Sequence, residues 1–120
     1  MKYTFFLAVA LYSCLVGVAV GASPPGVLTG SFIIGGKTVI DPPDNEPRNT
    51  HLQLFLSGAS AKALYGAMPV KPVKDQCLTD GSVTKFVGGT ACTMHKGGKE
   101  YTCSLAVNIK SQRVEPAFAC

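Results

Sequence analysis

Four cysteines lie in the C-terminal part of this 120-residue chain, at positions 77, 92, 103 and 120. Turn signals that contain glycine lie among them, at Asp80-Gly81, Gly88-Gly89 and Gly97-Gly98. Runs of β-prone residues fill the intervals, at 82–87, 90–95, 100–109 and 113–118. An even number of cysteines in a short chain is typical of exported domains held together by disulfides. We therefore expect an antiparallel sheet closed by two disulfide bonds.

The first 22 residues have the pattern of a signal peptide. Lys2 precedes an apolar run at residues 5–20, and small residues lead to Ala22. Cleavage after Ala22 would leave one domain at residues 23–120 and would remove the fifth cysteine, Cys14. A lipid-modified Cys14 and an uncleaved membrane anchor are the alternatives. The Ser-Pro-Pro-Gly start at residues 23–26 favours cleavage, so we expect a periplasmic or secreted protein without a stable membrane anchor.

The net charge of +4 is modest, and the basic residues are unevenly distributed. Residues 58–120 hold eight lysines and arginines against four acids. A charge this small, interspersed with acids, is not the pattern of a nucleic-acid binder. It is typical of a solubilising surface and slightly favours an acidic partner.

The region from residue 31 to residue 50 predicts a hairpin followed by a loop. Two β-prone runs, 31–34 and 37–40, flank Gly35-Gly36, which we interpret as a two-residue turn that pairs Phe32 with Val39. Residues 41–50 contain three prolines together with aspartate and asparagine, so they exclude a central strand or a helix. A loop of this length and stiffness is a candidate contact surface.

The next segment predicts a strand followed by a helix. Residues 51–56 alternate leucine with His51, Gln53 and Phe55, as a half-buried strand does. From 58 to 68 the period changes to helical spacing, with Ser57 as the N-cap and Pro69 ending the helix. Residues 70–75 contain Pro72 and predict a connector or edge segment. The fold class is therefore α+β: an antiparallel sheet of about five to seven short strands with one packed helix.

Hairpin register discriminates among the three possible cysteine pairings. A two-residue turn at Gly97-Gly98 places Cys92 opposite Cys103 in a hydrogen-bonded pair. A two-residue turn at Ser111-Gln112 places Cys103 opposite Cys120 in a non-hydrogen-bonded pair. The α-carbons of a non-hydrogen-bonded pair lie closer, at about 4.5 Å rather than about 5.5 Å, which suits a disulfide better.

The register therefore favours disulfides between Cys103 and Cys120 and between Cys77 and Cys92. Each would stabilise the domain by roughly 3 kcal/mol. That is a large share of the ~5 to 15 kcal/mol expected in total for a small domain.

Candidate chemistry is sparse. His95 would face Glu100 across the hairpin, which allows a carboxylate-oriented imidazole but equally an ordinary cross-strand pair. The sequence contains none of the zinc-binding, calcium-loop or phosphate-loop motifs, so we expect no metal and no cofactor. The residues that we expect to contact a partner are charged and lie in the proline-containing loop and the Gly97-Gly98 turn: Asp41, Asp44, Glu46, Arg48, Lys96 and Lys99.

Three features together resemble small exported disulfide-bonded proteins of Gram-negative bacteria. They are the leader, the Leu-x-Leu strand that leads into Ser57-Gly-x-Ser-Ala-Lys-x-Leu-Tyr65, and the later Cys92 to Tyr101-x-Cys103 run. Some proteins of this size and build inhibit lysozymes or confer immunity against toxins that cleave the cell wall. The resemblance implies an exported binding domain and assigns no inhibitory residue here.

We therefore expect a non-catalytic, exported protein-binding module, an inhibitor or immunity protein of a cell-wall-degrading enzyme. The alternatives are a small exported hydrolase that uses His95 and Glu100, and a structural component of the envelope. The partner would be another protein, and the sequence leaves the oligomeric state open.

Overall fold

The computed structural model describes residues 24–118 and residue 120, which form one antiparallel sheet with one helix. The strands are β1 (Gly30–Gly35), β2 (His51–Ser57), β3 (Val73–Lys74), β4 (Val83–Val87), β5 (Thr90–Met94), β6 (Tyr101–Asn108) and β7 (Val114–Glu115), and the helix is α1 (Gly58–Ala67). The fold class is α+β, as the sequence predicted. The signal peptide expected at residues 1–22 lies outside the described residues.

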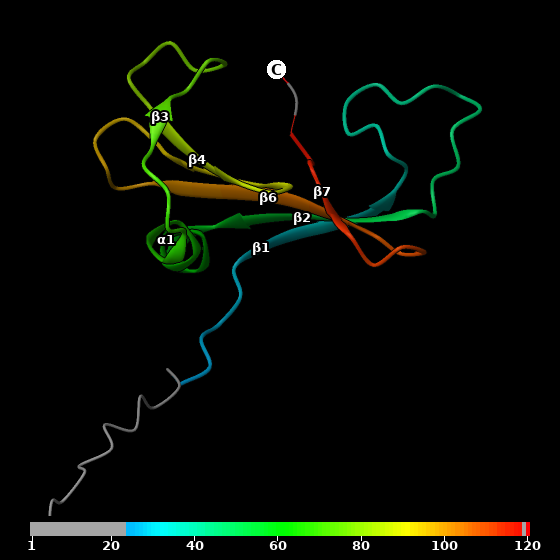
Figure 1. Ribbon diagram of the computed structural model, residues 1–120, viewed down its shortest axis with the longest axis horizontal. Helices are drawn as coiled ribbons and strands as arrows, with labels where there is room; N and C mark the ends of the chain where they lie inside the picture. Colours follow the sequence, from blue (N-terminus) through cyan, green and yellow to red (C-terminus); the bar gives the residue numbers. More distant parts are fainter. Residues whose placement is uncertain (1–23, 119) are drawn as a thin grey trace, which may run out of the picture.

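The sheet is ordered β1-β2-β6-β5-β4-β3, and the short β7 pairs with β6 as well. Strands β5 and β7 share one edge of β6: β5 pairs with residues 101–104 and β7 with residues 106–107. Figure 1 shows α1 on one side of the sheet and the long loops and the C-terminus on the other. We call these sides the helix face and the cleft face.

The helix forms where the helical spacing predicted it and packs through its small side chains. Ala61 is fully buried against the Cys92–Cys103 disulfide, and Met68 closes the far end of this core. Ser57 occupies the N-cap position with an extended backbone, but its side chain makes no capping hydrogen bond. Lys85 of β4 ties the C-terminal end of α1 to the sheet, because its Nζ donates to the carbonyl oxygens of Tyr65 (3.0 Å) and Met68 (3.1 Å).

The hairpin predicted at Gly35-Gly36 is wrong. Strand β1 pairs with β2 along its whole length, so Phe32 faces Leu54 rather than Val39, and residues 36–50 form one long loop between the two strands. Gly36 is buried against that loop: a Cβ there would lie 2.7 Å from the Pro47 carbonyl oxygen. The second glycine is therefore needed for a close backbone approach and not for a turn.

The predicted turn at Gly97-Gly98 has the right centre and the wrong length. Cys92 does face Cys103. However, His95 N donates to the Glu100 carbonyl (2.9 Å) and Gly98 N to the His95 carbonyl (3.0 Å), so a four-residue loop joins β5 and β6. His95 and Glu100 form a hydrogen-bonded pair, and hydrogen-bonded and non-hydrogen-bonded pairs alternate along the strands. Cys92, three residues before His95, therefore occupies a non-hydrogen-bonded position, whereas the two-residue turn predicted a hydrogen-bonded one.

The turn predicted at Ser111-Gln112 is also a four-residue loop, and here the register itself shifts. Val107 faces Val114, and Asn108 N donates to the Arg113 carbonyl (2.9 Å). The side chain of Asn108 builds the loop, because its Oδ1 accepts from Lys110 N and Ser111 N at 3.1 Å each. The predicted strand at 113–118 is consequently reduced to β7.

These two loops explain why the preferred cysteine pairing is wrong. The disulfides join Cys92 to Cys103 and Cys77 to Cys120. The non-hydrogen-bonded position of Cys92 and Cys103 brings their α-carbons to 4.0 Å, the close approach that a cross-strand bridge requires. After β7 the chain leaves the sheet and reaches the segment after β3, so that Cys120 meets Cys77.

Candidate functional site

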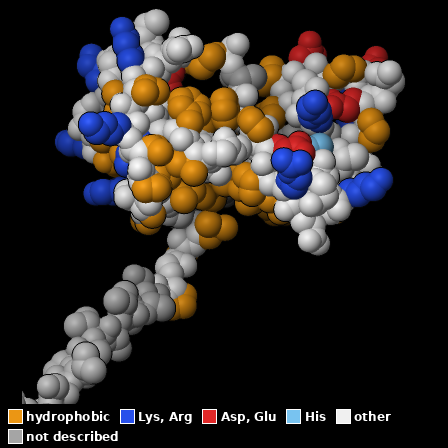
Figure 2. All heavy atoms as spheres, viewed as in Figure 1, with side chains coloured by type: hydrophobic (Ala, Val, Ile, Leu, Met, Phe, Trp, Pro, Cys, Tyr) orange, Lys and Arg blue, Asp and Glu red, His pale blue; other side chains and the backbone are white. Residues whose placement is uncertain are grey.

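An apolar cleft of about 770 Å³ lies on the cleft face of the sheet. This volume lies within the range of small-ligand and side-chain pockets. Its floor is formed by strand residues whose side chains point away from α1: Phe55, Thr84, Phe86, Ala91, Thr93, Thr102 and Ser104. Figure 2 shows hydrophobic side chains gathered between two raised lobes.

One wall of the cleft is the segment after β3 together with the C-terminal segment. Leu78, Ala117 and Phe118 line it, and the disulfide Cys77–Cys120 joins the two segments. Ala117 is buried, and the Phe118 ring packs against Phe86 of the floor with the ring centroids 5.3 Å apart. The disulfide therefore fixes an apolar wall that has almost no strand structure of its own.

Asp75 organises this same wall. Its Oδ1 accepts hydrogen bonds from the backbone N of Cys77 and of Leu78, both at 2.8 Å, and its Oδ2 accepts one from the Thr84 hydroxyl. The Thr84 hydrogen bond, followed by these backbone hydrogen bonds, lowers the pKa of Asp75 against an opposing effect of burial. Asp75 is the only charged side chain among the described residues that line the cleft.

The opposite wall is the loop at residues 36–50, which contributes Val39 and Ile40. Glu46 folds this loop, because its Oε1 accepts from the backbone N of Thr38 at 2.9 Å and from its hydroxyl at 3.2 Å. Gln53 anchors the start of the loop by donating from Nε2 to the Gly36 carbonyl (3.0 Å). The proline-containing loop is therefore a folded wall with internal hydrogen bonds.

A buried histidine lies beside this loop. His51 is 5% exposed; its ring Nδ1 lies 2.8 Å from Thr50 Oγ1 and its Nε2 lies 2.9 Å from Glu115 Oε2. Asn108 Nδ2 donates to the other oxygen of Glu115 at 3.2 Å. The His51 hydrogen bond, and then that of Asn108, lower the pKa of Glu115. This network connects β2, β6 and β7 at the loop end of the sheet.

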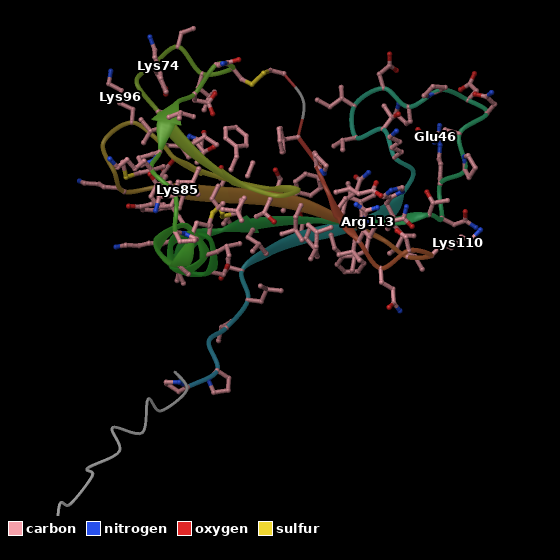
Figure 3. The ribbon with its side chains drawn as sticks, in the orientation of Figure 1. Glu46, Lys74, Lys85, Lys96, Lys110 and Arg113 are labelled. Atoms are coloured by element: carbon pink, nitrogen blue, oxygen red, sulfur yellow. A yellow bond between two sulfur atoms is a disulfide. The ribbon has the colours of Figure 1, made fainter. Side chains whose placement is uncertain are left out.

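The six residues expected to contact a partner are not brought together. Asp41, Asp44, Glu46 and Arg48 lie in the loop at one end of the sheet, and Lys96 and Lys99 lie in the β5–β6 loop at the other end. Figure 3 shows Glu46 and Lys96 on opposite sides of the molecule. Since β6 spans the distance between the two ends, they are separated by roughly 20 Å or more. The two loops that carry these residues lie at opposite margins of the cleft face, and the cleft lies between them.

His95 and Glu100 do face each other across the β5–β6 loop, through a backbone hydrogen bond. The imidazole, however, makes its hydrogen bond with Thr102: Nε2 lies 2.9 Å from Thr102 Oγ1. Thr102 lines the cleft, so His95 is connected to the cleft through a hydroxyl that the sequence interpretation did not consider.

The sequence interpretation missed the floor and the disulfide-fixed wall of the cleft. A signal for the floor is present: Thr84, Phe86, Ala91 and Thr93 occupy alternate positions that place them on one face. No local signal brings Phe118 onto Phe86, because that contact depends on the tertiary pairing of Cys77 with Cys120.

The described part of the chain contains no cluster of three or more histidine, cysteine, aspartate or glutamate side chains that would hold a metal ion. Among the same residues, no helix is long and apolar enough to cross a membrane. The two disulfides indicate an oxidising, extracellular environment.

Comparison with known proteins gives no relative: no family model, no curated protein and no solved structure matches this chain.

Proposed function

We propose that this chain is a non-catalytic, exported binding protein that captures apolar side chains of a partner protein in the cleft. The observation that carries the proposal is the cleft itself, an apolar hollow of about 770 Å³ on the cleft face of the sheet. Protein interfaces concentrate their binding energy in a few large side chains that enter such hollows. The charged margins of the cleft would then orient the partner.

The construction of the walls supports binding. A disulfide fixes one wall, and three prolines and the internal hydrogen bonds of Glu46 stiffen the other. A rigid site loses little conformational entropy when a partner docks. The single charged group of the lining, Asp75, already accepts three hydrogen bonds, which leaves it poorly placed for proton transfer. These features suit recognition better than turnover.

The export route and the partner class belong to the same proposal. An N-terminal signal peptide and two disulfides are consistent with a periplasmic or secreted protein. For such a protein, an envelope enzyme that cleaves the cell wall is a suitable partner, and inhibition of or immunity against it is the function we propose.

Photo-crosslinking tests this function. A photoreactive phenylalanine analogue replaces Phe118 in the cleft wall, where the side chain is 42% exposed. The matched control carries the analogue at Val70, which is 38% exposed, lies between α1 and β3 and does not line the cleft. We expect one discrete protein adduct from an envelope extract with the Phe118 probe and none with the Val70 probe. Combining the Phe118 probe with Ala91→Trp, which fills the cleft floor, should abolish the adduct.

The captured protein is then purified, and its hydrolysis of cell-wall material is measured with and without the binding protein. Inhibition that Ala91→Trp removes supports the proposal. An adduct that persists after the cleft is filled, or no adduct at all, would overturn it.

A second candidate function rests on the pair of Thr102 and His95. A hydroxyl that lines a cleft and lies 2.9 Å from an imidazole nitrogen has the geometry of a nucleophile and its base. A small exported hydrolase would therefore use Thr102 and His95, with Glu100 across the hairpin. Hydrolysis of p-nitrophenyl acetate that is lost in both Thr102→Val and His95→Ala would support it, and unchanged rates in both variants would exclude it.

A further inference from the structure

The helix face of the sheet is only half covered. Helix α1 contacts β2, β5 and β6 and lies over the row that contains Leu56, Cys103 and Cys92. In Figure 1 the helix is viewed almost end-on while the strands run across the picture, so its axis crosses the strands. Beyond this row, towards the loop end of the sheet, the same face continues without a helix.

Two apolar rows occupy the uncovered half. The first row is Phe32, Leu54 and Leu105, which face one another on β1, β2 and β6. Phe32 is 67% exposed although it lies in the middle of a strand. A single exposed aromatic residue is ordinary, but one aligned with two leucines of neighbouring strands begins a patch.

The second row lies two residues further along the strands. Ile34 faces Leu52, Leu52 faces Val107, and Val107 faces Val114. Ile34 is 50% exposed and Val114 is 49% exposed. We call the two rows together the platform; its seven side chains are all apolar.

The outward side of α1 has a related character. Ala59, Ala63, Gly66 and Ala67 are exposed there and carry no charge, and Val27 and Leu28 of the N-terminal segment line an apolar hollow together with Ala59 and Ala63. The one lysine of the helix, Lys62, is turned aside, with its Nζ 5.9 Å from the centre of the Tyr101 ring. An outward helix surface in water normally carries polar residues, so this one is suited to a second apolar layer.

From this shape we propose that two copies of the chain form a dimer in which α1 of each copy lies on the platform of the other. A helix raises its half of the face by about 10 Å above the sheet, which leaves the platform as a step of the same depth. A two-fold axis would place the raised half of each copy over the lowered half of its partner, as an isologous interface requires. The result is two sheets with both helices packed between them.

The dimensions of the helix and the platform agree. A ten-residue helix is about 15 Å long. Rows that cross three or four strands are about 10 to 15 Å wide at the usual strand spacing, and α1 crosses the strands in the same direction as these rows. The alanine and glycine side chains of its outer surface would permit the close approach that Ala61 already makes on its inner surface.

The area is sufficient for a stable dimer. The platform and the outward side of α1 together would remove on the order of 1,200 Å² of mostly apolar surface from water in two copies, which is the lower bound for specific protein interfaces. The cleft lies on the other face of the sheet, so both clefts of the dimer would remain open and point outwards.

Sedimentation equilibrium tests the dimer on the chain expressed with its own N-terminal segment and purified with both disulfides formed. We expect twice the chain mass at micromolar concentrations. Phe32→Glu on the platform and Ala63→Glu on the helix should each raise the dissociation constant by about 100-fold or more, because each would bury an unpaired carboxylate. The matched control, Ile33→Glu, alters a neighbouring, 52% exposed residue of β1 that points to the other face, and should leave the constant unchanged.

Circular dichroism of each variant confirms that it remains folded, and Val114→Glu replaces Phe32→Glu should that variant unfold. A wild-type chain that is monomeric up to about 100 μM would overturn the proposal, and binding of that monomer to lipid vesicles would assign the platform to a membrane instead. The proposal would also be overturned if the dissociation constant of the dimer were unchanged by the platform substitution or by Ala63→Glu.

Discussion

Gly89 illustrates how one residue sets the arrangement of strands. It follows β4 in the turn that begins β5, and a Cβ on it would lie 2.5 Å from the carbonyl carbon of Glu115 and 2.7 Å from its nitrogen. The backbone of β7 therefore passes directly over the turn. Only a residue without a side chain permits β5 and β7 to lie end to end along β6.

Gly89→Ala should consequently destabilise the protein by about 1–3 kcal/mol, because the added methyl group must displace backbone. The matched control is Gly66→Ala in α1, where a Cβ would meet no atom within 4 Å. That substitution should stabilise the protein by about 0.5–1 kcal/mol through helix propensity. Urea denaturation measures both. Equal effects of the two substitutions would show that Glu115 moves away from the turn at little cost.

His51 and Glu115 join strands β2 and β7, whose residues lie 64 positions apart in the sequence. The alternation at residues 51–56 indicated a half-buried strand, and its most buried residues are two polar ones, His51 and Gln53, which are 5% and 3% exposed. They are buried because the loop at 36–50 and β7 cover the cleft face there. Burial is tolerated because both ring nitrogens of His51 and the amide of Gln53 have partners.

This network predicts a pH dependence of stability. The folded-state pKa of Glu115 is lowered, so the folded protein favours its ionised form more than the unfolded chain does. Its contribution is therefore complete above the unfolded pKa of about 4.3 and is lost as the pH falls through the lower folded value. Free energies of unfolding measured from pH 7 to pH 2 should fall less steeply below about pH 4 in Glu115→Gln than in the wild type. Parallel profiles would contradict this assignment.

At the scale of elements, the lengths of two hairpin loops determined how the following strands pair and therefore which cysteines face each other. The hairpins predicted at Gly97-Gly98 and Ser111-Gln112 have four-residue loops instead of two-residue turns. Each loop is fixed by one local set of hydrogen bonds: that of Gly98 to His95 in the first, and those of the Asn108 side chain in the second. A change of two residues in loop length alters the pairing parity or the register of the following strand. The pairing of cysteines depends on both.

Peptide mapping without reduction should therefore recover Cys92 linked to Cys103 and Cys77 linked to Cys120. Because Cys92 and Cys103 are 0% and 3% exposed whereas Cys77 and Cys120 are exposed, a mild reductant should open the second bridge first. Its removal by the double substitution of Cys77 and Cys120 to alanine should cost about 4 kcal/mol, since it closes a loop with a sequence separation of 43. A mapped Cys103–Cys120 peptide would contradict the described register.

At the scale of the whole molecule, the sheet separates two surfaces that differ in construction. The cleft face carries loops, a disulfide-fixed wall and both signs of charge at its margins. The helix face carries one helix and the apolar platform. Because the sheet lies between them, none of the seven platform residues lines the cleft, and the two proposed interactions should be independent.

Independence of the two faces is measurable. Ala91→Trp should abolish the Phe118 adduct and leave the dissociation constant of the dimer within about twofold, and Phe32→Glu should do the reverse, since distant sites behave additively. Photo-crosslinking and sedimentation of the same two variants give the four values needed. Loss of both properties in either variant would indicate that partner binding and self-association share a surface.

The sequence alone determined the features that depend on neighbouring residues. Alternation predicted the strand at 51–56, and β-prone runs between glycine turn signals predicted the strands at 82–87 and 90–95. The change of period predicted α1, and Pro72 indicated that the segment containing β3 is a connector or an edge. These predictions are correct because the backbone and side-chain preferences that cause them act within a few residues.

Only the tertiary structure decided the partner of β1, the cysteine pairing, the burial of His51 and the existence of the cleft. Each depends on where segments far apart in the sequence meet: Phe118 on Phe86, Glu115 on His51, and Cys120 on Cys77. A local sequence pattern does not specify these contacts. The free energy that selects among alternative long-range pairings comes from the packing of the whole sheet, and that packing exists only once every strand is in place.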